Sequence, residues 1–373
     1  MATTSLVPQA AAGPCRTTSN TATHNQDSVI SSLRCSLPPQ QQAETDCMPG
    51  VRRHYEMQGI SDGAVQILMA SWRTSTQKEY KVYLDKWHNF CSRRSADPFL
   101  PSIRHVVDFL SALFKDRTYS TVNIARSALS AMGIKIDGVT VGSHPTVVRL
   151  LKGMHNIKPP RAKYTATWDP DIVLRHLATL VPIENISLKD LTLKLCMLLA
   201  LTQAARPQTI HLITINNLIK EANRYIFQLS GLLKHNKPGV PIPVIEVHKY
   251  PHDNSLCPYT VVTEYLNRTS DLRSNLKDKL LLSYVKPHNP ITVDTIRRWL
   301  KQTMEKAGID VNRFGSYSTR SASASKAASS NFPMNLIMKA AGWSRQSTFE
   351  RFYLRDIEPQ IQLSDHVLRM DQE

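Results

Sequence analysis

Five residues in the second half of the chain have the types and the order needed for attack of a tyrosine on a DNA phosphodiester. They are Arg206, Lys234, Arg320, Trp343 and Tyr353. A phosphodiester is anionic and resists nucleophiles. Cleavage without a metal therefore needs fixed cations around the phosphate, a nucleophile, and a proton donor for the leaving oxygen. These residue types supply each part, so we treat them as one candidate active site.

The two arginines suit a phosphate because a guanidinium group is permanently charged and binds two oxygens at once. Lys234 precedes turn-forming residues, and a lysine on a hairpin can donate a proton to a leaving hydroxyl. Lys237 is an alternative for this role. Tyr353 lies between Arg351 and Arg355, which favour an attacking phenolate. The joint order and spacing, more than any single residue, support the hypothesis.

The composition favours a polyanionic partner. The formal net charge is +16 at pH 7, and cations that neutralise phosphates release counterions, so nucleic acid is favoured over small acidic molecules. The six cysteines include no CxxC pair, so we expect neither a zinc site nor a disulfide framework, and we expect Cys196 to be a buried free thiol. No phosphate-binding Gly-rich motif is present. We therefore expect no cofactor and no metal.

The first part of the chain predicts a tail followed by a helical domain. Residues 1–55 are rich in Ala, Thr, Ser, Pro and Gln, a composition that predicts disorder. Residues 56–157 contain four apolar stripes at helical spacing, one of them beginning after a capping box at 76–79, and predict an all-α module. The basic residues expected on its polar faces could contact DNA or simply be solvated. They are Lys78, Lys81, Lys86, Arg93, Arg94, Arg104, Arg117 and Arg126.

Residues 158–167 predict a linker, because Pro159 and Pro160 stiffen the chain and exclude a helix. The second domain, residues 168–373, is expected to be mixed α+β. Helices are expected from Ser187 to about Arg206, from Pro258, and from a Thr292 cap to Gly308. Residues 225–229 predict a strand, and residues 240–247 predict its return strand at a sheet edge. The longest apolar run, residues 195–201, is too short to cross a membrane.

The carboxy-terminal motifs resemble those of the tyrosine recombinase (phage integrase) family, over about residues 60–358. Within that family the sequence is similar to the recombinases of DIRS-type retrotransposons. The resemblance rests on three stretches, Ser318–Ala327, Ala341–Ser344 and Ser347–Tyr353. It implies two domains, an all-α core-binding (SAM-like) domain and a mixed α+β catalytic domain.

The resemblance also implies roles. Tyr353 is the nucleophile that forms a 3′-phosphotyrosyl link, Arg206 and Arg320 bind the scissile phosphate, Lys234 protonates the leaving oxygen, and Trp343 packs at the site and donates its indole N–H. The implied function is site-specific recombination or integration for a mobile element. The implied partner is double-stranded DNA, held by a homotetramer on two sites. Nuclear localisation follows from the retrotransposon likeness, and no membrane association is expected.

Two departures from the family pattern keep alternatives open. Tyr317 stands three residues before Arg320, where the family usually has histidine, and a phenol cannot act as a base in the same way. The spacing from Trp343 to Tyr353 is also one residue longer than the common bacterial one. Tyr317 is therefore a second candidate nucleophile. The alternatives in function are a catalytically inactive DNA-binding protein derived from a mobile element and a type IB topoisomerase.

Overall fold

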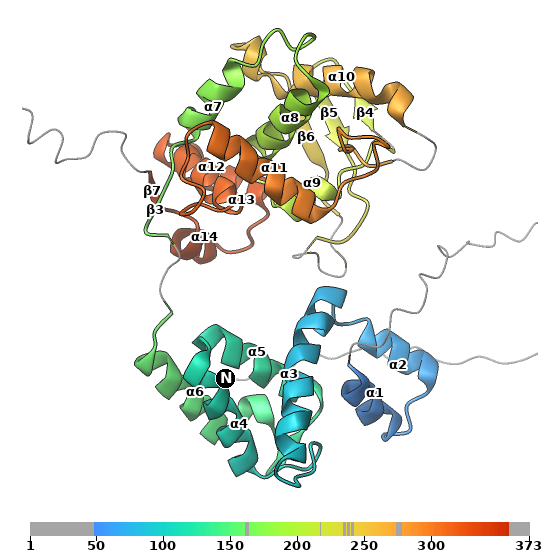
Figure 1. The fold of residues 1–373 in the computed structure, drawn as a ribbon, viewed down its shortest axis with the longest axis vertical. Coiled ribbons are helices and arrows are strands. Elements are labelled where there is room, and N and C mark those ends of the chain that lie inside the picture. The colour runs from blue at the N-terminus through green and yellow to red at the C-terminus, as the bar shows by residue number, and fades with distance from the viewer. Residues whose placement is uncertain are drawn as a thin grey trace, which may run out of the picture. The chain divides into compact units, whose positions relative to one another are not determined.

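The computed structural model describes residues 48–357, apart from 161–163, 217, 234, 235, 237, 238, 240, 241 and 274–277. The chain divides into two compact units, which we call the N-terminal unit (residues 1–160) and the C-terminal unit (residues 161–373). Figure 1 shows the elements of both. The division falls within the segment that its prolines marked as a linker.

The N-terminal unit consists mainly of helices. They are α1 (Pro49–Glu56), α2 (Asp62–Met69), α3 (Thr74–Ser92), α4 (Ile103–Asp116), α5 (Tyr119–Ala131) and α6 (Pro145–Ile157), with a short 3-10 turn, Val141–Ser143. Trp87 of α3 is fully buried and forms an aromatic cluster with Phe90 and Phe109. The apolar stripes of the sequence thus face one shared core.

A small hairpin interrupts this helical unit, which differs from the all-α expectation. Strand β1 (Lys135–Ile136) pairs antiparallel with β2 (Val139–Thr140). The turn between them is Asp137–Gly138, and both residues have positive φ, 53° and 77°. An Asp-Gly pair adopts this backbone at little cost and gives a turn with the twist of a hairpin, so the signal was present in the sequence.

Two predicted boundaries in this unit were wrong. The tail was expected to extend to residue 55, but α1 begins at Pro49, and Met48 and Val51 are fully buried. Burial of these side chains, together with a proline in the first turn, explains the helix. Helix α3 begins at Thr74 rather than after Thr76, and no side chain caps it. Residues 1–47 of the predicted tail lie outside the described part of the chain.

The C-terminal unit is rich in helices and has small sheets. Its helices are α7 (Pro170–Ala178), α8 (Leu188–Thr202), α9 (Pro207–His211), α10 (Pro258–Thr269), α11 (Val293–Lys306), α12 (Ser318–Ser329), α13 (Met334–Ala341) and α14 (Gln346–Phe352). Its strands are β3 (Ala166–Thr167), β4 (Ile219–Lys220), β5 (Arg224–Phe227), β6 (Ile245–His248) and β7 (Asp356–Ile357), and it has 3-10 turns at Asn254–Leu256 and Ser270–Leu272. None of the described helices of either unit is long and apolar enough to span a bilayer.

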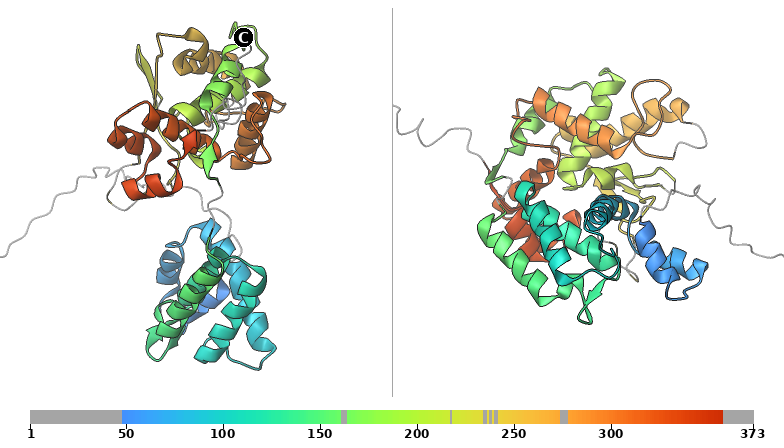
Figure 2. Two further views of the ribbon diagram at one scale, coloured as in Figure 1. Left: turned by 90° about the vertical axis from the view of Figure 1, so that its left-hand side faces the viewer. Right: turned by 60° about the horizontal axis from the view of Figure 1, so that its bottom comes forward.

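Helix α8 is the central element of the C-terminal unit, and α9, α10, α11 and α12 pack around it (Figures 1 and 2). Every residue from 191 to 201 is buried, which includes the Cys196 thiol as expected. The Ser187 hydroxyl accepts a hydrogen bond from the Asp190 N–H, so the predicted start of the helix is correct. Because other elements enclose α8, its position in the unit is fixed. The turn that follows Thr202 is therefore held in place as well.

The main sheet has the strand order β4-β5-β6 and is antiparallel, with Tyr225 opposite Val247. The return strand β6 lies at the predicted edge but begins at Ile245, later than expected. Pro243 has no N–H to donate to a neighbouring strand, and residues 242–244 accordingly do not extend β6 toward the turn. A second, parallel pair joins β3 to β7, near the two ends of the unit.

A lysine lies within the core of α8, although the sequence did not mark it. Lys194 is fully buried, and its ammonium group donates to the Leu180 carbonyl over 2.8 Å. Burial lowers the pKa of Lys194 to about 8, against the opposing effect of Asp253. Because burial disfavours the charged form, the folded protein binds this proton less tightly than the unfolded chain does.

Lys194 should therefore make stability depend on pH. Between about pH 8 and pH 10 the unfolded chain binds more protons at this position than the folded protein, so stability rises with pH. Relative to Lys194→Met, we expect the wild type to gain up to about 3 kcal/mol between pH 7 and pH 10. Urea unfolding of both proteins across this range measures the difference. A pH-independent difference would show that the ammonium group carries no burial penalty.

Candidate active site

A tight turn after α8 places Arg206. Helix α8 ends at Thr202, and Ala204 adopts a φ of +42°, which is strained for a residue with a side chain. Arg206 then caps the amino end of α9, whose first residue is Pro207. The Ala204 carbonyl accepts a hydrogen bond of 2.7 Å from the Arg320 guanidinium. The turn that carries one arginine is thus held by the other.

Arg320 lies in the first turns of α12 and is almost completely buried, with 3% of its surface exposed. Its guanidinium donates to the Ala204 carbonyl and, over 2.5 Å, to the Ala341 carbonyl. No carboxylate of the described residues pairs with it. Burial, and then the neighbouring Arg206, lower the pKa of Arg320 to about 9, while Tyr353 opposes this shift. A buried guanidinium group that has no carboxylate partner in the described part of the chain, next to the guanidinium group of Arg206, favours an anion.

Trp343 covers the face of Arg320. Helix α13 ends at Gly342, whose φ of +66° turns the chain sharply so that Trp343 folds back. The Arg320 guanidinium carbon lies 4.1 Å from the centroid of the indole ring. The indole also contacts Phe349, at 4.9 Å between ring centroids, and Tyr353, at 4.6 Å. The indole N–H is buried and has no hydrogen-bond partner among the described residues.

Tyr353 follows α14 and is partly buried. Its ring centroid lies 5.3 Å from the Arg320 guanidinium carbon, and the ring also contacts the indole of Trp343. Its backbone N–H donates to the Phe349 carbonyl over 2.8 Å, and its own carbonyl is held by hydroxyl groups of α12. The structure therefore brings Arg206, Arg320, Trp343 and Tyr353 together.

Tyr317 is not part of this cluster. Tyr317 is 53% exposed, and its hydroxyl accepts a hydrogen bond of 2.6 Å from Arg297, which also pairs with Asp294. It thus belongs to a surface network at the start of α12. Lys234, like its alternative Lys237, lies outside the described residues. Their roles remain predictions.

The start of α12 is rich in serine, and such hydroxyl groups can bind phosphate or cap helices. The structure shows them bound to protein carbonyls. Ser318 and Thr319 donate to Gly315 and Ser316, and Ser323 donates to Leu201. Ser321 and Ser325 instead donate to the Tyr353 carbonyl. The spacing of four residues put these two on one helical face, but no local signal indicated what that face would contact.

Trp343 should be the main packing residue of the site. It is 8% exposed and packs in a small core cluster with Ala324, Ile337 and Phe349. We expect Trp343→Ala to lower the free energy of unfolding by about 3–5 kcal/mol, because it removes a large buried ring and leaves a cavity. Urea denaturation checks this. The matched control is Phe352→Ala, which truncates a 58% exposed aromatic ring and should change stability little. Equal effects would contradict this packing role.

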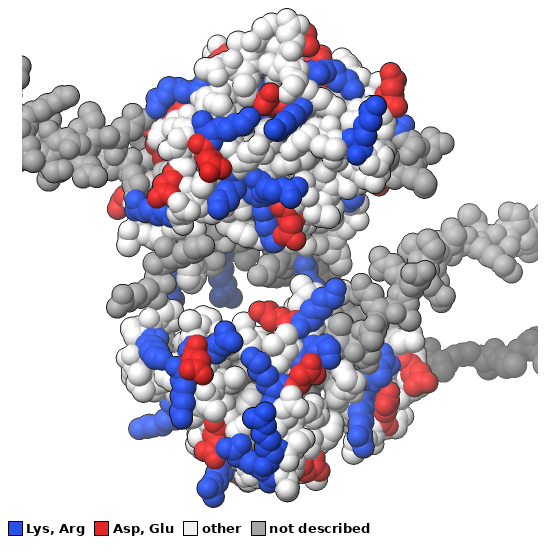
Figure 3. Space-filling view, viewed as in Figure 1, with Lys and Arg blue, Asp and Glu red and all other residues white. Residues whose placement is uncertain are grey.

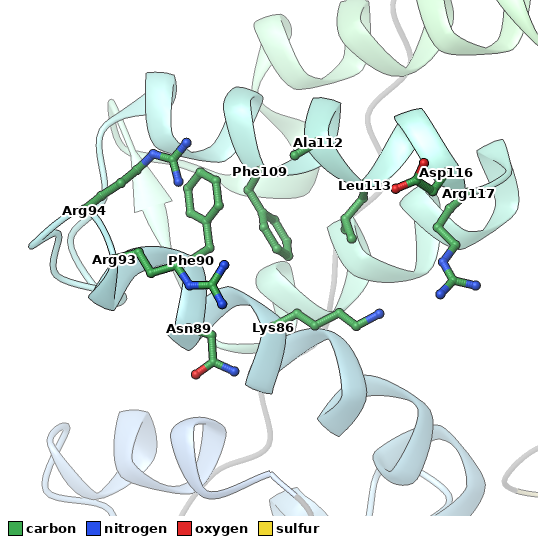
Figure 4. A pocket seen from close by; sticks show the side chains of 10 residues that line it. All are labelled: Lys86, Asn89, Phe90, Arg93, Arg94, Phe109, Ala112, Leu113, Asp116 and Arg117. Atoms are coloured by element: carbon green, nitrogen blue, oxygen red, sulfur yellow. The ribbon is translucent and has the colours of Figure 1, made fainter.

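The N-terminal unit carries a basic pocket between α3 and α4. Figure 4 shows Phe90, Phe109 and Leu113 along it, with cationic side chains around them. Those cations are Lys86, Arg93, Arg94 and Arg117, and the acid among the lining residues is Asp116. The Arg94 guanidinium stacks 3.8 Å from the centroid of the Phe90 ring. Figure 3 shows basic side chains over much of the visible face of this unit, with acidic ones scattered among them.

The candidate active site lies in a segment that is similar to a known family. Residues 175–358 match the phage integrase family, and this range contains every member of the cluster. The segment therefore resembles the catalytic domain of tyrosine recombinases (phage integrases). No curated protein matches the sequence significantly.

Two solved structures share the fold. The XerH site-specific recombinase bound to palindromic difH substrate, in a post-cleavage complex, is 15% identical, with a TM-score of 0.55 over 82% of this chain and 91% of that chain. The pre-cleavage complex of XerH with difH is 14% identical, with the same TM-score and coverage. A lambda integrase dimer bound to a COC′ core site is 15% identical over 88% of this chain and 79% of that chain, with a TM-score of 0.46. The family match and the two XerH structures show that the C-terminal unit has the tyrosine recombinase catalytic fold.

Proposed function

We propose that this protein recombines or integrates DNA at specific sites through a covalent 3′-phosphotyrosyl intermediate. The observation that carries the proposal is a pair of buried N–H groups, Nε of Arg320 and Nε1 of Trp343, beside the ring of Tyr353. Neither group has a hydrogen-bond partner within the part of the chain that the structure describes. Buried donors in folded proteins are nearly always satisfied. Two unsatisfied donors beside two guanidinium groups therefore indicate a place for an anion such as a phosphodiester.

In this reaction the Tyr353 hydroxyl oxygen attacks the phosphorus and loses its proton. The bond from phosphorus to the 5′ oxygen breaks, and the leaving oxygen takes a proton to become a 5′-hydroxyl. Arg206 and Arg320 bind the non-bridging oxygens, whose negative charge is greatest in the transition state. Lys234 is proposed as the donor of the proton. The phosphotyrosyl bond retains the energy needed for religation, so the proposed reaction requires neither a metal nor a nucleotide.

The test is a covalent trapping experiment in EDTA. A pool of short duplexes with a randomised centre and a nick in one strand is incubated with the protein. Cleavage beside the nick releases a short fragment, which prevents religation and leaves the protein on the DNA. We expect a denaturation-resistant adduct, enriched for one family of sequences, with the DNA on the peptide that contains Tyr353. DNA binding without any adduct would instead favour the catalytically inactive DNA-binding protein.

The basic pocket of the N-terminal unit is proposed to contact the DNA backbone. Its guanidinium groups are exposed cations of the kind that bind phosphates. Each phosphate contact adds about 0.9 to the magnitude of the slope of log affinity against log salt concentration. We expect the double variant Arg93→Gln, Arg94→Gln to weaken binding and to reduce that slope by about 2. The matched control is Arg298→Gln, Lys301→Gln on α11, which removes the same charge elsewhere. Filter binding at several salt concentrations distinguishes the two.

The biological setting is also proposed. The motifs around Arg320 and Tyr353 are similar to those of DIRS-type retrotransposon recombinases, which supports a mobile element and, from it, action in the nucleus. Strand exchange between two duplexes requires four active sites, which supports a homotetramer on two DNA sites. Light scattering of the trapped complex measures this assembly directly. One protomer on one duplex, with relaxation of supercoiled DNA, would instead support a topoisomerase.

A further inference from the structure

We infer that Ser321 and Ser325 are positioning residues that hold Tyr353 for attack. The inference rests on the proposed function, since it assigns these residues to the same reaction. The Ser321 hydroxyl donates to the Tyr353 carbonyl over 2.5 Å, and the Ser325 hydroxyl donates to the same oxygen over 3.1 Å. The Ser325 hydroxyl also accepts from the Arg355 N–H over 3.0 Å. We call this arrangement the serine clamp.

The serine clamp supplies hydrogen bonds to a backbone carbonyl at the end of α14, where the helix itself offers no N–H. Tyr353 is the cap residue after α14, and carbonyl groups at that position have no partner within the helix. Ser321 and Ser325 are 8% and 2% exposed, so water does not readily take their place. Both peptide groups that follow the nucleophile's α-carbon are thus fixed to α12, and the only rotations left to the phenol are those of its own side chain.

One helix thereby positions two parts of the reaction. Arg320 directly precedes Ser321 on α12, so the residue proposed to bind the phosphate and the residues that hold the nucleophile move as one rigid segment. Arg355 adds a second attachment, because its guanidinium donates to the Tyr164 carbonyl over 3.1 Å.

The experiment measures single-turnover adduct formation at saturating DNA, with the nicked duplex most enriched in the trapping selection. Loss of the serine clamp lets the phenol leave its attacking position, and misplacement by about 1 Å can reduce a rate about 100-fold. We expect that reduction for Ser321→Ala, Ser325→Ala, with DNA affinity unchanged. Ser321→Thr, Ser325→Thr keeps both hydroxyls and should restore most of the rate. Ser329→Ala, which removes an exposed hydroxyl of the same helix, is the matched control.

The outcomes separate the inference from the proposed function. Absence of an adduct with the wild type would overturn both. An adduct with the wild type and an equal rate for the double alanine variant would overturn the serine clamp alone. If the double variant unfolds, Ser325→Ala decides, because this residue makes two of the three hydrogen bonds. We expect it to slow the reaction at least tenfold, and a rate equal to that of Ser329→Ala would contradict the inference.

Discussion

Tyr353→Phe should abolish the covalent adduct while leaving DNA affinity within about twofold of the wild type. The substitution removes only the hydroxyl oxygen, and without that oxygen no phosphotyrosyl bond can form. The ring remains, so its contact with Trp343 at 4.6 Å is kept. We therefore expect loss of the chemical step without loss of the fold. Denaturing gel electrophoresis of labelled duplex measures the adduct, and thermal unfolding checks the structure.

The matched control is Tyr317→Phe, the other tyrosine of the motif. Its hydroxyl accepts a hydrogen bond from Arg297 at the surface, and it has no described contact with Trp343 or Tyr353. We expect adduct formation to continue, with a rate within about threefold of the wild type, because an exposed hydrogen bond contributes little to stability. The reverse result, in which only Tyr317→Phe loses the adduct, would make Tyr317 the nucleophile.

Arg320→Lys should slow adduct formation by about 100- to 1,000-fold, the range measured when one preorganised donor is removed from a transition state. Lysine keeps the charge but loses the planar group. A guanidinium can donate to the Ala204 and Ala341 carbonyls, stack 4.1 Å from the Trp343 ring, and still direct a further N–H at a phosphate. A single ammonium group cannot satisfy all of these contacts.

Arg298→Lys is the control for this variant, since Arg298 is an exposed arginine of α11 in the same unit. It should react at the wild-type rate. A lysine at position 320 that supports the full rate would show that only the charge is needed there. If Arg320→Lys instead fails to bind DNA, the arginine contributes to ground-state binding, and the rate at saturating DNA separates the two effects.

Much of the site was predictable from the sequence because its residues lie in short motifs. The order of Arg320, Trp343 and Tyr353 indicated one site, and the structure brings these residues together with Arg206. The caps at Ser187 and Thr292 also gave two helices with their correct starts. These features are local: the side chain and the backbone group that it binds are a few residues apart.

Other features depend on contacts between distant residues, and these were missed. The partner of Ser321 is the Tyr353 carbonyl just after α14, and the partner of Lys194 is a carbonyl before α8. No periodicity of the sequence predicts such pairs. The early start of α1 has the same cause, because the side chains of Met48, its N-cap residue, and Val51 favour a helix here only when a core exists to bury them. The Asp137–Gly138 turn differs, since its signal was local and was overlooked.

The parallel pairing of β3 with β7 has a consequence for how the backbone around Tyr353 is held. Ala166 pairs with Asp356 and Thr167 with Ile357, so the strand at the start of the C-terminal unit is fastened just downstream of Tyr353. Tyr164, two residues before β3, packs against Phe314 of the main core. The backbone that follows Tyr353 is therefore joined to the main core through the first residues of the unit, as well as to α12 through the serine clamp.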